Sequence, residues 1–216
     1  EDMSVWQFQE ASVFRGRSFP YYLPMARTIR LGDVYLGTDK VSHMMGYGRR
    51  YFKKYSGDVG KGVSPFDAED KQIRWGLRRE LSVVGRWVDG IVSYADMEAN
   101  YQGMRMAIEM SSGEAPLFGL RDGNWVALRE MDILPYITPD LDETWNNNHY
   151  WLLRKWFVLP LLRDEYVDHL YDDGVQARFE VYRGYTPSRN RVYIDEYWAT
   201  KKRNPRKKQS LETIYR

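Results

Sequence analysis

The chain has 216 residues, enough for one medium-sized domain or a domain with an appendage. It contains no cysteine, which excludes disulfides, thiolate catalysis and cysteine-based zinc sites. The net charge is +2, but the segment KKRNPRKK (201–208) carries six Lys or Arg, so subtracting them leaves about −4 for the remainder. We therefore expect a solvated basic tail at 201–216, with salt-dependent attachment to anionic surfaces, and no nucleic-acid partner.

The hydropathy of the chain and its first residue bear on the cellular location of the protein. No apolar run approaches the ~20 residues of a membrane span. The sequence begins at Glu1 rather than Met, so we expect an exported protein, periplasmic or membrane-anchored, after removal of a signal segment. Aromatic residues make up 15% of the chain, which suits either a core with half-exposed edges or surfaces that meet sugar or lipid.

In chain order, residues 1–32 contain two prolines without a steady period and predict an N-terminal arm. Thr38 is expected to cap a first helix with Asp39 in its first turn, and the Gly- and Pro-containing segment 56–65 ends it. A second helix opens at Pro65 or Asp67. Its apolar stripe has helical spacing and closes at Gly90. The stripe consists of Ile73, Leu77, Leu81, Val84 and Val88.

Ser93 and Asp96 form a capping-box pattern that predicts a third helix over 94–110. The segment PLFGLRDGNWVAL then predicts a hairpin around its Asp-Gly turn. A helical stretch follows 148, with a break or kink at Pro160. VQARFEVYRGY resembles a strand and NRVYIDEYW a mixed segment. The sequence thus predicts a mainly α fold: a three-helix core at 33–112 bears a polar site, and a smaller α+β extension at 113–200 packs on it.

Polar residues share faces with the apolar stripes of all three helices. Residues four apart lie on one face, so Asp39 and His43 are neighbours, as are Asp96 and Asn100. Glu80 lies between two stripe positions. If the three faces converge, three carboxylates meet one imidazole and one amide, and packed carboxylates need a counter-charge, a shared proton or a metal ion.

This grouping allows a specific chemistry. Asp39, Glu80 and Asp96 offer oxygen ligands of the kind that Ca²⁺ or Mg²⁺ prefers. His43 beside a carboxylate suits a general base or nucleophile, and Asn100 and Ser93 suit substrate binding. Simpler explanations stay open: the aspartates as helix-terminus residues, Glu80 as a surface ion-pair partner, and His43 as a core residue.

The order D-K-x-x-H, then a Glu on a second helix, then S-x-x-D-x-x-A-N-x-x-G resembles the VanZ-like and YfiM-like families of the lipocone superfamily. The resemblance covers roughly 34–108. The matching residues are Asp39, Lys40, His43, Glu80, Ser93, Asp96, Ala99, Asn100 and Gly103, with Asp89 and Gly90 as the preceding acidic-Gly pair. It implies a helical protein in or on a membrane, whose polar residues act on phosphate-linked or polyprenyl-linked lipid head groups. YGRRYFKKY and KQIRWGLRRE are too charged for membrane-spanning helices, so a soluble variant is implied.

Three functions follow as hypotheses. The first is an envelope-associated hydrolase of a phosphate-linked lipid or polyprenyl-linked cell-wall precursor, with or without a divalent cation. The second is a peptidoglycan glycan-strand hydrolase that uses paired carboxylates, Glu80 with Glu98 or Asp96. The third is a non-catalytic envelope protein in which the polar residues only fix helix register. The expected partners are accordingly a membrane surface or lipid-linked substrate, or peptidoglycan.

The loop DETWNNNHYW is expected to cover the mouth of this site. It contains Asp142, Glu143 and His149, and loops on a rigid scaffold are often functional, although a helix-capping role is the alternative. Within it, Trp145 is predicted to contact substrate, because a loop aromatic at a rim meets ligand rather than core.

Overall fold

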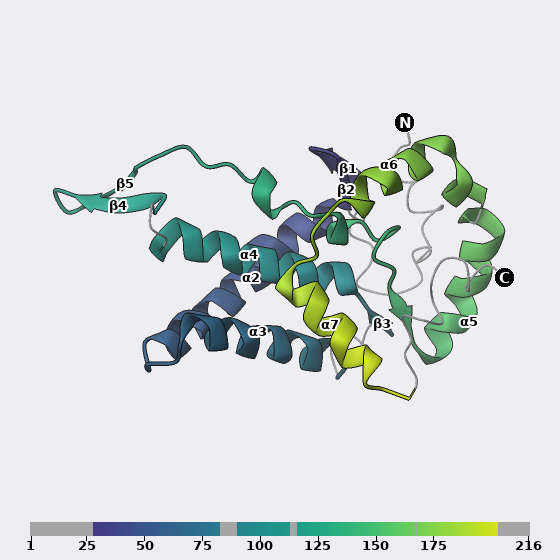
Figure 1. The fold of residues 1–216 in the computed structure, drawn as a ribbon, viewed down its shortest axis with the longest axis horizontal. Helices are drawn as coiled ribbons and strands as arrows, with labels where there is room; N and C mark the ends of the chain where they lie inside the picture. The colour runs from purple at the N-terminus through teal and green to yellow at the C-terminus, as the bar shows by residue number, and fades with distance from the viewer. Residues whose placement is uncertain (1–27, 83–89, 113–115, 167, 203–216) are drawn as a thin grey trace.

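The computed structural model describes residues 28–82, 90–112, 116–166 and 168–202. It is mainly helical, with three short two-stranded sheets among these residues (Figure 1). Within the described ranges, none of the helices combines the length and apolar character needed to cross a bilayer. The first elements are β1 (Thr28–Leu31) and β2 (Val34–Gly37), which pair antiparallel and lead into the helices. The arm predicted for 1–32 therefore includes a strand, and residues 1–27 lie outside the described residues.

Three helices form at the predicted places. They are α2 (Thr38–Val59), α3 (Pro65–Glu80) and α4 (Tyr94–Ser112). Ser64 caps α3, since its Oγ accepts from the backbone N of Asp67 at 3.1 Å. Ser93 caps α4 in the same way, accepting from the N of Asp96 at 3.1 Å. The capping signal at Ser93 is therefore confirmed, whereas Thr38, expected to cap α2, is the first residue of that helix, whose N-cap is Gly37 without a side-chain hydrogen bond.

The second helix is shorter than its apolar stripe predicts. It ends at Glu80 instead of Gly90, and Val84 and Val88 lie outside the described residues. At this point the side chain of Glu80 accepts a hydrogen bond from the backbone N of Ser93 at 3.0 Å, which ties the end of α3 to the start of α4. A tertiary hydrogen bond at this end cannot be read from periodicity.

The close approach of α2 and α4 is the centre of the fold (Figure 1). They touch backbone to backbone at two glycines: a Cβ on Gly48 would lie 2.7 Å from the Cα of Gly103, and one on Gly103 would lie 2.1 Å from the carbonyl O of Met44. Apolar side chains pack around this contact in three clusters. The helices diverge on either side of the contact. One side holds the polar residues around His43, and the other side holds an apolar surface that includes Phe52.

The Asp-Gly hairpin forms as predicted. Strands β4 (Phe118–Arg121) and β5 (Asn124–Ala127) pair antiparallel. Asp122 and Gly123 turn the chain with φ of 52° and 78°, the left-handed region that such a turn requires. The hairpin projects from the end of α4, away from the remaining elements (Figure 1).

The chain then returns through short elements. Two 3₁₀ turns, η2 (Leu134–Tyr136) and η3 (Pro139–Leu141), lead to β6 (His149–Tyr150), which pairs with β3 (Ile91–Val92). Helix α5 (Leu152–Leu161) contains Pro160 and passes directly into the π turn η4 (Leu162–Tyr166). The α-helical hydrogen-bond pattern therefore ends one residue after Pro160, next to the position where a break or kink was predicted. The 3₁₀ turn η5 (Asp168–Tyr171) follows.

In the last part of the extension the structure has a helix where the sequence predicted a strand. VQARFEVYRGY forms α6 (Asp173–Arg183), and the mixed segment forms α7 (Arg189–Ala199), capped by Ser188. In α6, Phe179 and Tyr182 are three residues apart and both pack on one core cluster, which is a helical spacing. Ile194 of α7 is buried against residues of α3 and α4. Neighbouring β-formers favoured the strand locally, but burial of one helical face decides the element.

Candidate functional site

A buried lysine organises the polar residues between the N-terminal halves of α2 and α4. Lys40, whose side chain is 2% exposed, lies 2.6 Å through its Nζ from one oxygen each of Asp39, Asp96 and Glu143. Asp39 and Glu143 reach solvent, with side chains 43% and 45% exposed, whereas Asp96 is mostly buried. We call these four residues the Lys40 cluster.

The charge state of Lys40 follows from this geometry. Burial by itself would lower the pKa of Lys40, but the negative charges of Glu143, Asp96 and Asp39 outweigh it and raise the pKa well above the ordinary value. The side chain is therefore a permanent ammonium at neutral pH. It cannot act as a proton acceptor, and it serves instead as a fixed positive charge that holds the three carboxylates in place.

His43 lies one helical turn after Asp39 and faces the same cluster. Its Nδ1 is 3.1 Å from Oδ1 of Asn100, and its Nε2 is 3.5 Å from Oδ2 of Asp96. The Asn100 side chain also hydrogen-bonds Tyr51. When Nδ1–H donates to the amide oxygen of Asn100, Nε2 is the nitrogen free to take a proton beside Asp96.

The imidazole of His43 is also fixed from its ring face. It stacks on Tyr47, with ring centroids 5.4 Å apart and an interplanar angle of 17°. The ring remains partly exposed. Contacts to both nitrogens and to one face orient the imidazole while leaving it accessible, which is the arrangement that a general base or nucleophile needs.

Ser93 and Glu80 join the network at its other end. Ser93 Oγ lies 3.4 Å from Oε1 of Glu143, and its backbone N donates to Glu80. Burial raises the pKa of Tyr51, and the nearby charge of Glu80 raises it further, so the Tyr51 hydroxyl stays protonated. The structure thus brings Asp39, His43, Asp96, Asn100 and Ser93 together, with Glu80 bound to Ser93 rather than to the lysine.

The carboxylates of the Lys40 cluster are the candidate metal ligands in the described part of the chain. Asp39, Asp96 and Glu143 each offer an oxygen, and these oxygens lie within 4.8 Å of one another. Such an oxygen set is suited to Ca²⁺ or Mg²⁺. The ammonium of Lys40 occupies the point between them, so a cation would have to displace it or bind beside it at the exposed oxygens of Asp39 and Glu143. Glu143, not Glu80, completes this triad.

Two other predicted site residues, Trp145 and Glu98, make packing contacts and hydrogen bonds that hold distant segments of the fold together. Trp145 packs on Phe179 and Tyr182, with ring centroids 5.3 and 5.7 Å away, instead of standing free at a rim. Glu98 is fully buried. Its carboxylate accepts hydrogen bonds from Ser188 at 2.8 Å and Asn190 at 2.9 Å, which ties the start of α7 to α4.

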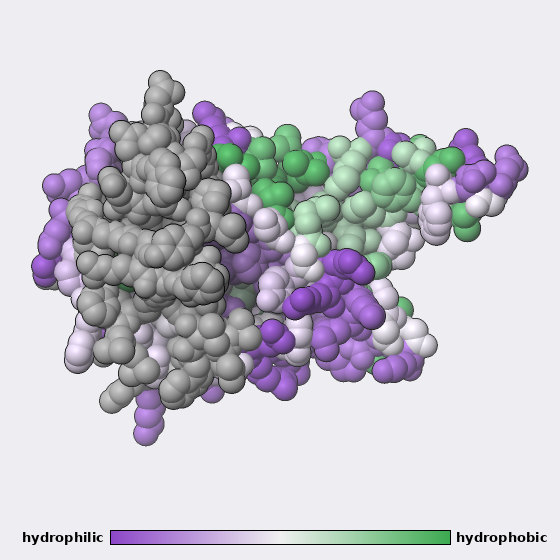
Figure 2. Space-filling model, turned by 180° about the vertical axis from the view of Figure 1, so that it is seen from behind, coloured by the Kyte–Doolittle hydropathy of each residue, from purple (hydrophilic) through white to green (hydrophobic). Residues whose placement is uncertain are grey.

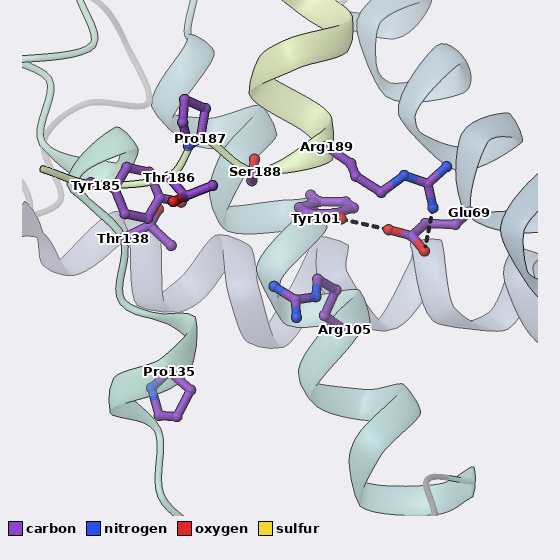
Figure 3. Close-up of a pocket in the computed structure, with 10 residues that line it drawn as sticks. All are labelled: Glu69, Tyr101, Arg105, Pro135, Thr138, Tyr185, Thr186, Pro187, Ser188 and Arg189. Carbon is purple, nitrogen blue, oxygen red and sulfur yellow. Dashed lines mark hydrogen bonds and ion pairs between the residues drawn. The ribbon is translucent and has the colours of Figure 1, made fainter.

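A separate polar pocket of about 430 Å³ lies beside the start of α7, where Tyr185–Arg189 meet α3 and α4 (Figure 3). Glu69 closes one side of it, accepting from the Tyr101 hydroxyl at 2.5 Å and pairing with Arg189 at 2.9 Å. None of the predicted catalytic residues lines this pocket.

Sequence reasoning assigned no role to Lys40 and only a covering role to the loop of Glu143. The D-K-x-x-H pattern contained Lys40, and a lysine among residues predicted to bring three acids together was a usable signal for their counter-charge. Glu143 had no comparable signal, because its contact with Lys40 depends on where the chain returns after the hairpin.

Fold and site together define a mainly helical protein whose two crossing helices hold an accessible histidine beside a lysine–carboxylate cluster. Comparison with protein-family models, curated proteins and solved structures gives no match for the chain.

Proposed function

We propose that the protein is a hydrolase that cleaves a phosphate ester in a phosphate-linked lipid or a polyprenyl-linked envelope precursor. The observation that carries the proposal is the accessible His43, held by Asn100 on one nitrogen and flanked by Asp96 on the other. The substrate class comes from the motif resemblance described above, and the assignment to the cell envelope rests on the same resemblance.

In the proposed reaction, Nε2 of His43 takes a proton from water as the water oxygen attacks phosphorus. The bond from phosphorus to the ester oxygen breaks, and the departing oxygen receives a proton from the imidazolium, which returns the histidine to its neutral form. Asp96 stabilises the transient imidazolium, and the ammonium of Lys40 fixes Asp96 in position. His43 acting directly as nucleophile would use the same contacts.

The charge of the site bears on whether a cation takes part. Around the single ammonium stand three carboxylates, and two of them reach solvent. An anionic phosphate approaching this surface would be repelled unless a cation bridges it to the protein. We therefore include Ca²⁺ or Mg²⁺, held beside Lys40 at the exposed oxygens of Asp39 and Glu143, as the group that would neutralise the phosphate.

The test is a hydrolysis assay on lipid phosphates and polyprenyl phosphates, with and without a chelator. We expect His43→Gln to lower the rate by about 100-fold or more while the melting temperature changes little. His169→Gln is the matched control, because His169 lies on the surface and pairs with Asp172 three residues away. Equal activity of the two variants would refute the catalytic role of His43 and favour the non-catalytic hypothesis.

The glycan-strand alternative is less favoured by the surroundings of its carboxylates. Glu98 is fully buried and held by the start of α7. The carboxylate of Asp96 is held by the lysine ammonium rather than facing a second carboxylate across a substrate-sized gap. Release of sugar from peptidoglycan strands by the wild-type protein, with no release of phosphate, would reverse this preference.

A further inference from the structure

An apolar hollow lies on the other side of the α2–α4 contact from His43. It measures about 380 Å³ and is lined by Phe52 of α2, Ala107, Met110 and Ser111 of α4, and Phe118 and Trp125 of the hairpin. Phe52 follows His43 by nine residues, about 13 Å along the helix, with the Gly48–Gly103 contact between them. The hollow is therefore distinct from the candidate catalytic site.

Its lining offers almost nothing to a polar ligand. The only hydroxyl, on Ser111, already donates to the carbonyl oxygen of Ala107 at 2.7 Å. The remaining lining side chains are apolar or aromatic. An occupant that needed hydrogen bonds would lose those it makes with water, so the hollow suits hydrocarbon.

The hairpin extends this apolar surface outward. Phe118, Leu120, Trp125 and Ala127 alternate with their neighbours and pair across the strands, so they share one face of the ribbon. Leu120 and Trp125 are mostly exposed, Trp125 at 73%. Figure 2 shows apolar surface continuing from the projecting end of the molecule onto the adjoining helices. Exposed apolar patches of this kind mark binding surfaces.

Exposed basic side chains lie on the same helix and the same hairpin as residues that line the hollow. Arg49 and Lys53 are exposed on α2, three residues before and one residue after Phe52, and Arg121 is exposed next to the hairpin-turn residue Asp122. Within the described residues none of the three basic side chains is engaged in an ion pair. Apolar and aromatic side chains accompanied on the same elements by exposed Lys and Arg outside ion pairs match the layers of an anionic bilayer surface, with hydrocarbon inside and phosphate outside.

We propose that this surface, formed by the hollow and the hairpin face, docks the protein on an anionic membrane, with Leu120 and Trp125 in the hydrocarbon boundary. A second copy of the chain fits less well, because a two-fold interface would place Arg49 and Lys53 near the same residues of the partner copy. The inference does not rest on the proposed hydrolase function, which uses the opposite side of the helix crossing.

The experiment is cosedimentation of the full chain with vesicles of phosphatidylcholine alone or with an equal part of phosphatidylglycerol. We expect binding to the anionic vesicles, weakened about tenfold or more by Trp125→Ala. Trp156→Ala is the matched control, since Trp156 is 75% exposed on α5, and it should bind like the wild type. Both variants keep the basic tail, so a difference between them cannot come from it.

The charge contribution is tested by the double variant Arg49→Gln/Lys53→Gln. Each lost charge should weaken binding by about fivefold, and by less at high salt. Equal loss in the Trp125 and Trp156 variants, or absence of vesicle binding by the wild type, would overturn the proposal. So would a concentration-dependent dimer in analytical ultracentrifugation that Trp125→Ala abolishes, because it would make a second copy the occupant.

Discussion

Replacing Lys40 by methionine tests the centre of the site directly. The substitution keeps much of the side-chain volume and removes the ammonium that three carboxylates contact at 2.6 Å. Asp39, Asp96 and Glu143 are then left facing one another without a counter-charge. The structure therefore predicts that the variant is less stable than the wild type.

The size of the effect follows from the exposure of the three acids. Removing one partner of a fully buried ion pair costs about 3–5 kcal/mol, because the other charge stays buried and unpaired. Here Asp39 and Glu143 are nearly half exposed, so water takes over part of the role of the ammonium. We therefore expect the free energy of unfolding to fall by an amount at the lower end of this range, about 3 kcal/mol. For a chain of this size that corresponds to a fall in Tm of about 6–12 °C.

Denaturant unfolding followed by circular dichroism measures the loss, with Lys71→Met as the control. Lys71 is 51% exposed and pairs with Asp58 at 3.5 Å, so its removal should cost less than about 1 kcal/mol. If both methionine variants unfold at the denaturant concentration of the wild type, Lys40 is not the counter-charge of the site.

Four further predictions follow. Because the pKa of Lys40 is raised in the folded state, its stabilisation is complete below the ordinary value of 10.5 and is lost as pH rises through the raised pKa. Urea titrations of the wild type and Lys40→Met should therefore converge only above that pH, and convergence near neutrality would contradict the assignment. Added Ca²⁺ should raise the Tm of Lys40→Met more than that of the wild type, since the freed carboxylates form a cation site, and equal shifts would argue against it. Gly103→Ala should cost more than about 3 kcal/mol, because the new Cβ would lie 2.1 Å from the Met44 carbonyl, whereas Gly46→Ala, with nothing within 4 Å, should stabilise α2 by about 0.5–1 kcal/mol. Chemical denaturation measures the stability of both glycine variants, and similar losses of stability in the two would disprove the close contact between α2 and α4. Trp145→Ala should destabilise the protein by about 2 kcal/mol or more through lost packing on Phe179 and Tyr182, and an unchanged melting curve would return Trp145 to the role of a ligand-contacting residue.

Local patterns in the sequence determined the main helices and the hairpin. Ser93 before the third helix and the Asp-Gly pair between β4 and β5 act through contacts a few residues away. Such contacts depend on neighbours in sequence, so their spacing is readable without a structure. The same holds for Asp39 and His43, which share a helical face because they are one turn apart.

The tertiary structure decided which polar groups meet. Lys40 and Asp96 are 56 positions apart in the chain, and Glu143 comes from a loop that returns after the hairpin. Glu98 was a candidate catalytic carboxylate in the sequence, yet it is buried and accepts a hydrogen bond from Asn190, which lies 92 positions later in the chain. The helix α6 was misjudged for the same reason, and Trp145, which was predicted to contact substrate, packs against the distant residues Phe179 and Tyr182. Spacing fixes the face of a helix on which a side chain lies, but only the packing of distant segments determines what that face meets.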